Sequence, residues 1–300
     1  MRLAVAATPD VALPALDWIL RSDHELVLIF TQPDRPAGRG RKIRESEVAA
    51  WGNLHGIPVV KASSAESLSP HLAGVDLVVT IAFGILIPEP LLKIPQHGFL
   101  NVHFSRLPHL RGAAPVQRAI LQGDSEIGIS IFQLEKGMDT GPVYVCEDFA
   151  IDRNETSGEL LRRLAANVPG LLDRALKMII GGQLPKAQEG SVSLAPKISK
   201  EEARIQWDGK GNEIRNLIRA FTPQPGAWTT WRGEKFHISG ANISSEKLSP
   251  GEIHVRQNEI FVGTGSEALS LTFVTPFGKS AMGAADWARG ARLSEGERFE

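Results

Sequence analysis

The chain has 300 residues, 42% of them hydrophobic and 22% charged, and its formal net charge is −1. The length exceeds what one hydrophobic core usually organises, so the sequence predicts two domains. The near-neutral charge excludes nucleic-acid binding through overall charge, so such a function would require local clusters of Lys and Arg. A single cysteine, Cys146, excludes an internal disulfide and a multi-cysteine metal site.

The sequence carries no recognisable targeting or membrane segment. Its N-terminal apolar run, Leu3–Ala7, is too short for a signal peptide. Nothing approaches the roughly 18–20 apolar residues that a membrane-spanning helix needs. We therefore expect a cytoplasmic protein that does not contact a membrane.

The first half of the chain alternates short apolar segments with longer amphipathic ones. Segments rich in Val and Ile are expected to be strands: Leu3–Ala7, Glu25–Thr31, Ile57–Val60, Asp76–Ala82, Gly98–His103 and Gly128–Leu134. Helices are expected at Glu45–His55, Pro115–Gln122 and Asn154–Gly181, the last kinked or interrupted at Pro169. This alternation predicts an α/β domain with a Rossmann-like open, mostly parallel sheet and helices on both faces. The turn after the first strand lacks the glycines of a dinucleotide-binding loop, which argues against a dehydrogenase.

Five basic residues follow the second predicted strand within ten positions: Arg35, Arg39, Arg41, Lys42 and Arg44. With the glycines and prolines between them, residues 35–44 are expected to form an exposed, mobile, cationic segment, called the arm below. A charged segment is most often a plain solvated loop. Arginine-rich flexible segments also suit RNA phosphates, and this one leaves a strand at the edge where open α/β sheets bind ligands. We therefore favour RNA contact.

The segment 98–115 carries the most informative pattern. Asn101 and His103 stand two apart in a predicted strand, so their side chains project from one face near the strand's C-terminal end. An Asn amide and a His ring are donors that suit an oxyanion forming on a carbonyl carbon. Taken alone, a His at a strand end is more often structural than catalytic.

A third polar residue, Asp139, lies in a glycine-flanked turn after the strand Gly128–Leu134. An isolated Asp-Thr-Gly is usually a simple turn. At the end of a neighbouring strand, its carboxylate would orient His103 and raise the pKa of the imidazole by favouring the charged form. We therefore expect Asn101, His103 and Asp139 to meet at the strand ends of one sheet.

The composition changes after the long helix. Gln188–Lys200 is polar with little periodicity and is typical of a linking segment. From Trp207, a short helix at Gly211–Phe221 is followed by short β-type segments, which predict a smaller OB-like β-barrel domain carrying a helix. We assign a catalytic domain to residues 1–188, a linker to 189–206 and the second domain to 207–300. That second domain has eleven basic and eleven acidic residues, so its net charge is zero and gives no indication of RNA binding.

Several motifs together resemble a known family. They are Asn-Val-His at 101–103 with Ser-x-Leu-Pro behind it, Arg-Gly-Ala-Ala-Pro at 111–115 and Met-Asp-Thr-Gly at 138–141. This pattern resembles the 10-formyltetrahydrofolate-dependent formyltransferases. Three further segments are similar to that family as well: Thr31–Gly40, Lys197–Ile205 and Ile218–Phe221. The resemblance implies a metal-independent monomer that takes 10-formyltetrahydrofolate as co-substrate. It implies transfer of the formyl group to the amino group of methionine on initiator tRNA, for translation initiation.

The resemblance also assigns roles by position. It implies that Asn101, His103 and Asp139 are the catalytic trio and that the arm binds tRNA. It also implies that Ser105, Arg106, Leu107 and Pro108 bind folate and that the pterin ring packs against Ile85, Leu86 and Ile87. The last three residues would equally suit a plain core junction between a strand and a helix. The chain departs from the family pattern at Ala7, Phe104 and Arg106, and the last two would alter the shape of the folate site.

Two other functions are compatible with parts of this pattern. Formyl transfer to another amine, such as an amino sugar nucleotide, would use the same trio but leaves the arm and the matching linker unexplained. A non-catalytic RNA-binding protein on a degenerate formyltransferase fold would not need Asn101, His103 and Asp139 together.

Overall fold

The computed structural model describes residues 1–37 and 42–300, which form two compact units. One unit comprises Met1–Pro115, Glu126–Ala150 and Leu161–Pro196, and the other comprises Val116–Ser125, Ile151–Leu160 and Lys197–Glu300. Two short segments from the middle of the chain therefore belong to the unit that the C-terminal third builds. The domain boundaries assigned from the sequence, 1–188, 189–206 and 207–300, stay a prediction.

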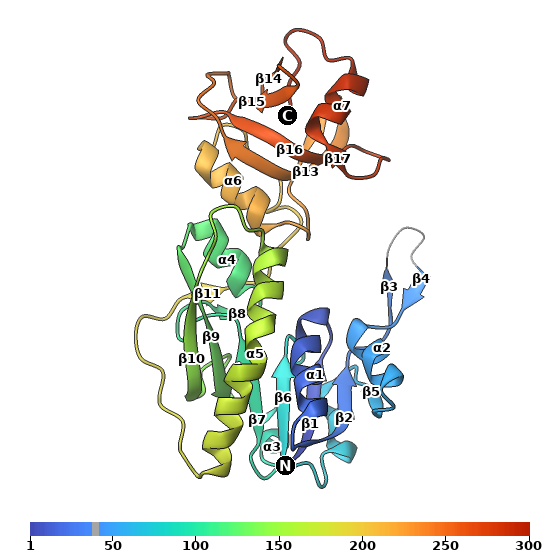
Figure 1. The fold of residues 1–300 in the computed structure, drawn as a ribbon, viewed down its shortest axis with the longest axis vertical. Helices are drawn as coiled ribbons and strands as arrows, with labels where there is room; N and C mark the ends of the chain where they lie inside the picture. The colour runs from blue at the N-terminus through green and yellow to red at the C-terminus, as the bar shows by residue number, and fades with distance from the viewer. Residues whose placement is uncertain (38–41) are drawn as a thin grey trace. The chain divides into compact units, whose positions relative to one another are not determined.

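The first unit is built on a seven-stranded sheet (Figure 1). Its strands are β1 (Arg2–Ala7), β2 (Glu25–Thr31), β5 (Val59–Lys61), β6 (Leu77–Ile81), β7 (Phe99–His103), β9 (Glu126–Gln133) and β10 (Val143–Ala150). They lie in the order β10-β9-β7-β6-β1-β2-β5 and are parallel from β7 to β5, while β9 pairs antiparallel with both of its neighbours, β7 and β10. The predicted open, mostly parallel sheet is confirmed.

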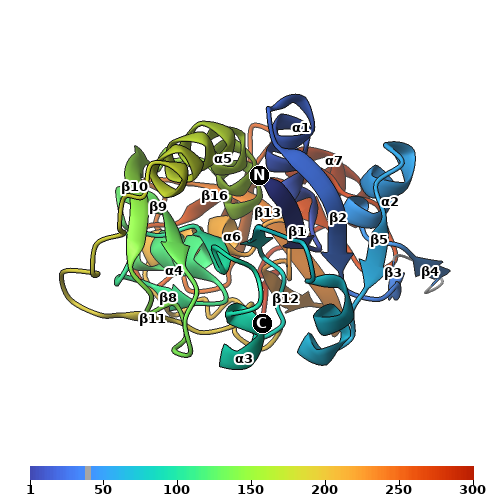
Figure 2. The ribbon, with the colours of Figure 1, turned by 90° about the horizontal axis from the view of Figure 1, so that it is seen from below.

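Helices cover both faces of this sheet, which explains why its central strands are almost continuously apolar. Figure 2 shows α1 (Leu13–Arg21) and α5 (Ser157–Ile180) on one side of the strands and α3 (Glu89–Leu92) on the other. On the α3 side, side chains of β1 and β2 pack with the 3-10 helix η2 (Ala65–His71), as Ala4, Phe30 and Leu68 do. The remaining helical segments are η1 (Asp10–Ala12) and α2 (Glu47–Leu54).

The long helix α5 passes through Pro169 without a break. The predicted interruption at this residue is therefore wrong. A proline in a helix interior removes one backbone hydrogen bond. The buried stripe that includes Leu164, Val168 and Leu172 is continuous on both sides of it, and burial of that stripe outweighs the missing bond.

The second unit carries an antiparallel sheet, which confirms the predicted β-rich part of the chain. Its strands are β12 (Trp228–Trp231), β13 (Glu234–Ile243), β14 (Ile253–Arg256), β15 (Glu259–Val262), β16 (Leu269–Thr275) and β17 (Met282–Gly283). Its helices are α4 (Pro115–Gln122), whose first residue belongs to the other unit, α6 (Gly211–Ala220) and the unpredicted α7 (Ala284–Ala291). Aromatic side chains fill the core, where the rings of Trp207 and Phe299 stack at 5.5 Å.

Two pairs of short strands complete the chain. β8 (Arg111–Gly112) pairs in parallel with β11 (Leu194–Ala195) in the first unit. β3 (Arg35–Ala37) and β4 (Lys42–Arg44) form an antiparallel hairpin at the two ends of the arm. Within residues 1–37 and 42–300, no helix combines the length and the apolar character needed to cross a membrane.

Candidate active site

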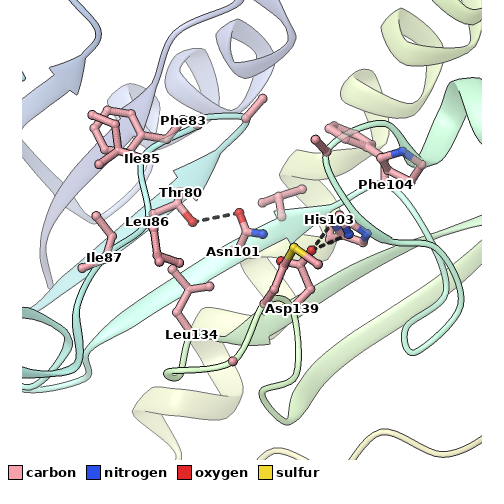
Figure 3. Close-up of a pocket in the computed structure, with 18 of the residues that line it drawn as sticks. Thr80, Phe83, Ile85, Leu86, Ile87, Asn101, His103, Phe104, Leu134 and Asp139 are labelled. Carbon is pink, nitrogen blue, oxygen red and sulfur yellow. Dashed lines mark hydrogen bonds and ion pairs between the residues drawn. The ribbon is translucent and has the colours of Figure 1, made fainter. Parts of the chain in front are cut away.

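The first unit contains a cavity of about 400 Å³. Its floor is formed by the last residues of β6 and β7, and its rims are formed by the loops at 82–87 and 134–139 (Figure 3). Ile85, Leu86 and Ile87 line one side, where Ile87 is buried and Leu86 is 77% exposed. The cavity is therefore an apolar slot with polar groups along one edge, as a flat heteroaromatic ligand requires.

Asn101 and His103 both line this cavity, as their spacing on one strand face predicts. The buried hydroxyl of Thr80 on the neighbouring strand lies 2.8 Å from the Asn101 Oδ1 atom and donates to it. The same hydroxyl lies 2.9 Å from the Leu100 carbonyl oxygen, so its one proton is shared between that carbonyl and the amide oxygen, which is turned toward Thr80. Figure 3 shows the amide nitrogen turned away from Thr80, toward the side of the cavity that holds His103 and Asp139.

The His103 ring is buried, and both of its nitrogens face defined oxygen atoms. Nε2 lies 2.9 Å from the carbonyl oxygen of Leu110. Because a carbonyl only accepts, this hydrogen bond requires the proton on Nε2. Nδ1 lies 3.8 Å from Oδ2 of Asp139. In the neutral ring, the nitrogen that can accept a proton is therefore the one beside the carboxylate.

Two opposing effects set the pKa of His103. Burial disfavours the charged ring and is the larger effect, so the pKa lies below its ordinary value. The Asp139 carboxylate and the Leu110 carbonyl act in the opposite direction. The predicted sign of the Asp139 contribution is correct, but the expected net rise in pKa is wrong because desolvation outweighs it. At neutral pH the ring is poised to accept a proton.

Asp139 reaches the site along an unexpected path. Strand β9 runs antiparallel to β7, and Gln133 at its end pairs with Leu100 rather than with His103. The loop after β9 therefore has to fold back along β7, so the expectation that all three residues lie at strand ends on one edge is wrong. The loop also passes so close to the end of β9 that a Cβ atom at Gly141 would lie 1.8 Å from the carbonyl oxygen of Gln133. Only glycine fits there.

The backbone of Asp139 is left-handed, with φ +52°, and its carboxylate is held in place. The backbone N–H of Gly112 donates to Oδ2 at 2.8 Å. A charge-assisted bond of this kind fixes the oxygen that faces His103. Asn101, His103 and Asp139 therefore meet at one cavity.

The four residues Ser105–Pro108 lie outside the cavity lining, and the neighbouring Phe104 lies within it. Ser105 is fully buried and donates to the carbonyl oxygen of His109 at 2.5 Å. The Arg106 guanidinium pairs with Asp148, with Nε at 2.7 Å from Oδ1. Leu107 is buried as well. Here these residues support the loop after β7, and their role in binding folate stays a prediction.

The arm is described only at its two ends. Arg35 and Arg44 are exposed and directly opposite each other in the β3–β4 hairpin. Arg35 donates to the side chain of Gln32. Arg39 and Arg41 lie outside the described residues, and Lys42 is described by its backbone alone.

Several residues of the site were not predicted from the sequence. Thr80 orients Asn101, Gly112 holds Asp139, and the Leu110 carbonyl fixes the His103 tautomer. Thr80 has a sequence signal, since it is the one polar residue in the strand Leu77–Ile81. In the part of the chain that the structure describes, no group of three or more His, Cys, Asp or Glu residues is arranged to hold a metal ion.

Residues 1–176 match the formyl transferase family, and residues 197–292 match the formyl transferase C-terminal domain. The chain is 43% identical over 307 residues to the methionyl-tRNA formyltransferase of Streptomyces griseus, covering 99% of both chains. It is 44% identical over 326 residues to the methionyl-tRNA formyltransferase of Acidothermus cellulolyticus, covering all of both chains.

A solved structure resembles the fold. The N-formyltransferase of Helicobacter canadensis, solved with folinic acid and dTDP-3-aminofucose, superimposes with a TM-score of 0.69 at 18% identity. The match covers 90% of this chain and 98% of that one.

Proposed function

This chain belongs to the formyl transferase family and formylates the amino group of methionyl-initiator tRNA for translation initiation; we propose that Asn101, His103 and Asp139 carry out the transfer. The formyl donor is 10-formyltetrahydrofolate. The observation that carries the proposal is the pairing of an oriented amide donor with a buried, neutral imidazole at the edge of one apolar slot. We propose further that the protein works as a cytoplasmic monomer.

The donor would lie with its pterin against Ile85, Leu86 and Ile87. The methionine α-nitrogen attacks the formyl carbon, and the carbonyl electron pair moves onto oxygen. The Asn101 amide N–H groups, turned toward the cavity by Thr80, stabilise that oxyanion. Preorganised donors of this kind act on the charge that develops in the transition state.

His103 then moves one proton. Nδ1 accepts the proton that the attacking nitrogen loses, and Asp139 stabilises the transient imidazolium. The same proton passes to N10 of the folate as the carbon–N10 bond breaks. The products are N-formylmethionyl-tRNA and tetrahydrofolate, and no further reactant is needed. Burial favours the neutral ring before the reaction, and the carboxylate favours the charged ring during it.

A direct assay tests the activity. The full-length chain is incubated with 10-formyltetrahydrofolate labelled in its formyl group and with methionyl-tRNA, or with a dTDP-linked amino sugar. Labelled formylmethionyl-tRNA with an unlabelled sugar is expected. The reverse pattern would move the assignment to sugar formylation, and no label in either acceptor would leave a binding protein.

Thr80→Val should lower kcat about three- to tenfold. The substitution keeps the side-chain volume but removes the hydrogen bond that orients Asn101, and one such bond contributes about 0.5–1.5 kcal/mol. The Michaelis constants for both substrates should change less than twofold. Thr156→Val is a matched control, because Thr156 bonds an exposed carboxylate, that of Glu159. Equal kcat for Thr80→Val and wild type would show that the amide does not depend on this bond.

The arm should contact tRNA phosphates. Replacing Arg39, Arg41 and Lys42 with Ala is expected to raise the Michaelis constant for methionyl-tRNA and leave that for the folate donor unchanged. Affinity for tRNA falls as the salt concentration rises. The slope of log affinity against log salt should become shallower by about one unit for each lost phosphate contact. If the arm also positions the 3′ end, kcat should fall too.

A matched triple variant separates the arm from general charge. Lys93, Arg174 and Lys177 are exposed basic residues of the first unit, and their replacement by Ala changes the net charge equally. That control should bind tRNA as wild type does. Wild-type binding and an unchanged salt slope in the arm variant would refute the assignment.

A further inference from the structure

Gln188 touches the loop that carries Asp139, although it lies 49 positions further along the chain. Its Nε2 donates to two backbone carbonyl oxygens, those of Asp139 and Gly141, each at 2.8 Å. Its Oε1 accepts from the guanidinium of Arg111, from Nη2 at 2.6 Å and from Nε at 3.2 Å. Both the nitrogen and the oxygen of the amide are therefore hydrogen-bonded. The nitrogen binds the loop that carries Asp139, and the oxygen binds Arg111, which precedes Gly112.

These contacts form a closed ring through the site. The main chain of Asp139 is bound by Gln188, and Gln188 is bound by Arg111. Arg111 precedes Gly112, whose N–H returns to the Asp139 carboxylate at 2.8 Å. The backbone and the side chain of Asp139 are thus tied to the same two-residue strand, β8.

The segment around Gln188 is itself fixed by the backbone. Lys186 and Val143 exchange hydrogen bonds of 2.7 and 2.9 Å, which attach the segment to the start of β10. Beyond Gln188, Leu194 and Ala195 pair with Arg111 and Gly112. Backbone pairing on both sides of Gln188 therefore fixes the position from which its side-chain amide reaches the loop.

The loop has an uncommon backbone conformation that this support helps to hold. Asp139 adopts a left-handed φ, which only a few per cent of residues other than glycine adopt, Asp among the most frequent of them. Two donors from Gln188 bind the carbonyls on either side of Thr140 and hold this turn. This turn sets the distance between Oδ2 of Asp139 and Nδ1 of His103, which is 3.8 Å.

We propose that Gln188, held by Arg111, is a positioning residue for formyl transfer that fixes Asp139 relative to His103. This inference rests on the proposed role of Asp139. Gln188 does not line the cavity, so it acts through the loop and not on the substrates.

Gln188→Glu is the sharpest test. Glutamate keeps the length and the acceptor for Arg111, but it replaces the donor with an oxygen that faces two carbonyl oxygens. The loop should move, and a displacement of about 1 Å at a reacting group can cost on the order of a hundredfold in rate. We expect kcat to fall about ten- to a hundredfold, with the Michaelis constant for the folate donor within about threefold of wild type.

The pH profile separates positioning from a merely structural role. In Gln188→Met, which adds no charge, a displaced Asp139 carboxylate supports the His103 imidazolium less, so the acidic limb of the kcat profile should move to lower pH, as in Asp139→Asn. The carboxylate that Gln188→Glu adds opposes this shift, so the pH profile is measured on Gln188→Met. Gln188→Glu combined with Asp139→Asn should be no slower than Asp139→Asn alone, because both changes act on one carboxylate. A merely structural defect would leave the acidic limb of the kcat profile at the wild-type pH. It would also make the double variant slower than Asp139→Asn alone.

Two further variants complete the experiment. Gln183→Glu carries the same charge change on an exposed residue five positions earlier in the chain, and it should behave as wild type. Arg111→Lys keeps one donor to Gln188 and should give a smaller shift in the same direction. Gln188→Met also replaces Gln188→Glu in the rate measurement if the latter does not fold.

The outcomes distinguish a failure of the positioning role of Gln188 from a failure of the proposed function. If Asp139→Asn is slow and shifted while the folded Gln188 variants match wild type, the positioning role is overturned and the proposed function stands. If Asp139→Asn itself matches wild type, the proposed role of Asp139 fails and the positioning role fails with it.

Discussion

Replacing Asn101 with Ala is expected to lower kcat for formyl transfer by about 10²–10³-fold, the usual effect of removing one oxyanion donor. The amide is the side-chain donor that Thr80 turns toward the cavity, and the oxyanion forms only after the amine attacks. The loss should therefore appear in kcat, while the Michaelis constants change little. Steady-state kinetics with both substrates measure it.

The matched control is Asn53→Ala. Asn53 lies in α2 and bonds the exposed carboxylate of Glu45, so its loss should leave kcat within about twofold of wild type. Asn101→Ala should keep its tRNA affinity and its melting temperature within a few degrees. A kcat near that of wild type would remove Asn101 from the mechanism.

Asp139→Asn is expected to slow the reaction by about a hundredfold or more, within the usual range for loss of general acid–base catalysis, and to displace its pH dependence. In our mechanism the neutral form of His103 is active, so the rate falls as pH drops through the pKa of the ring. Asp139 raises that pKa. Removing the carboxylate therefore lowers the pKa further and moves the acidic limb of the kcat profile to lower pH.

The direction of this shift is the informative result. Binding of the folate donor should persist, because the apolar slot around Ile85 and Ile87 is untouched. Asp173→Asn is a suitable control, since Asp173 pairs with Lys177 on α5 and neither residue lines the cavity. A slow variant with an unshifted acidic limb would contradict the coupling between Asp139 and His103.

Local patterns predicted most strands of the first sheet and also the helix Pro115–Gln122. Glu25–Thr31 and Pro115–Gln122 are found with the expected bounds. The strand expected at Ile57–Val60 lies instead at Val59–Lys61, because pairing with Ile29 and its neighbours sets the register. Helix α1 was missed although Pro14 stands in its first turn, where proline favours a helix start.

The site was predictable only where its residues are neighbours in the chain. Asn101 and His103 follow from a period of two along a strand. Asp139 was identified correctly as a residue of this cavity, but the geometric reason was wrong, because an antiparallel β9 cannot be distinguished from a parallel one by its own composition. Thr80 and Gln188 act through contacts 21 and 49 positions away, and no local pattern encodes such distances.

The divided composition of the second unit has a consequence for biosynthesis. Residues 116–125 and 151–160 belong with residues 197–300, and Arg219 of α6 donates to the carbonyl oxygens of Asp152 and Glu155 at 2.7 and 3.0 Å. On the ribosome Asp152 and Glu155 emerge first, and roughly 65 more residues are made before Arg219 follows, about 3–13 s at ~5–20 residues per second. For that interval these two carbonyl oxygens lack the guanidinium that binds them in the finished protein, and a chain terminated at residue 196 would lack it permanently.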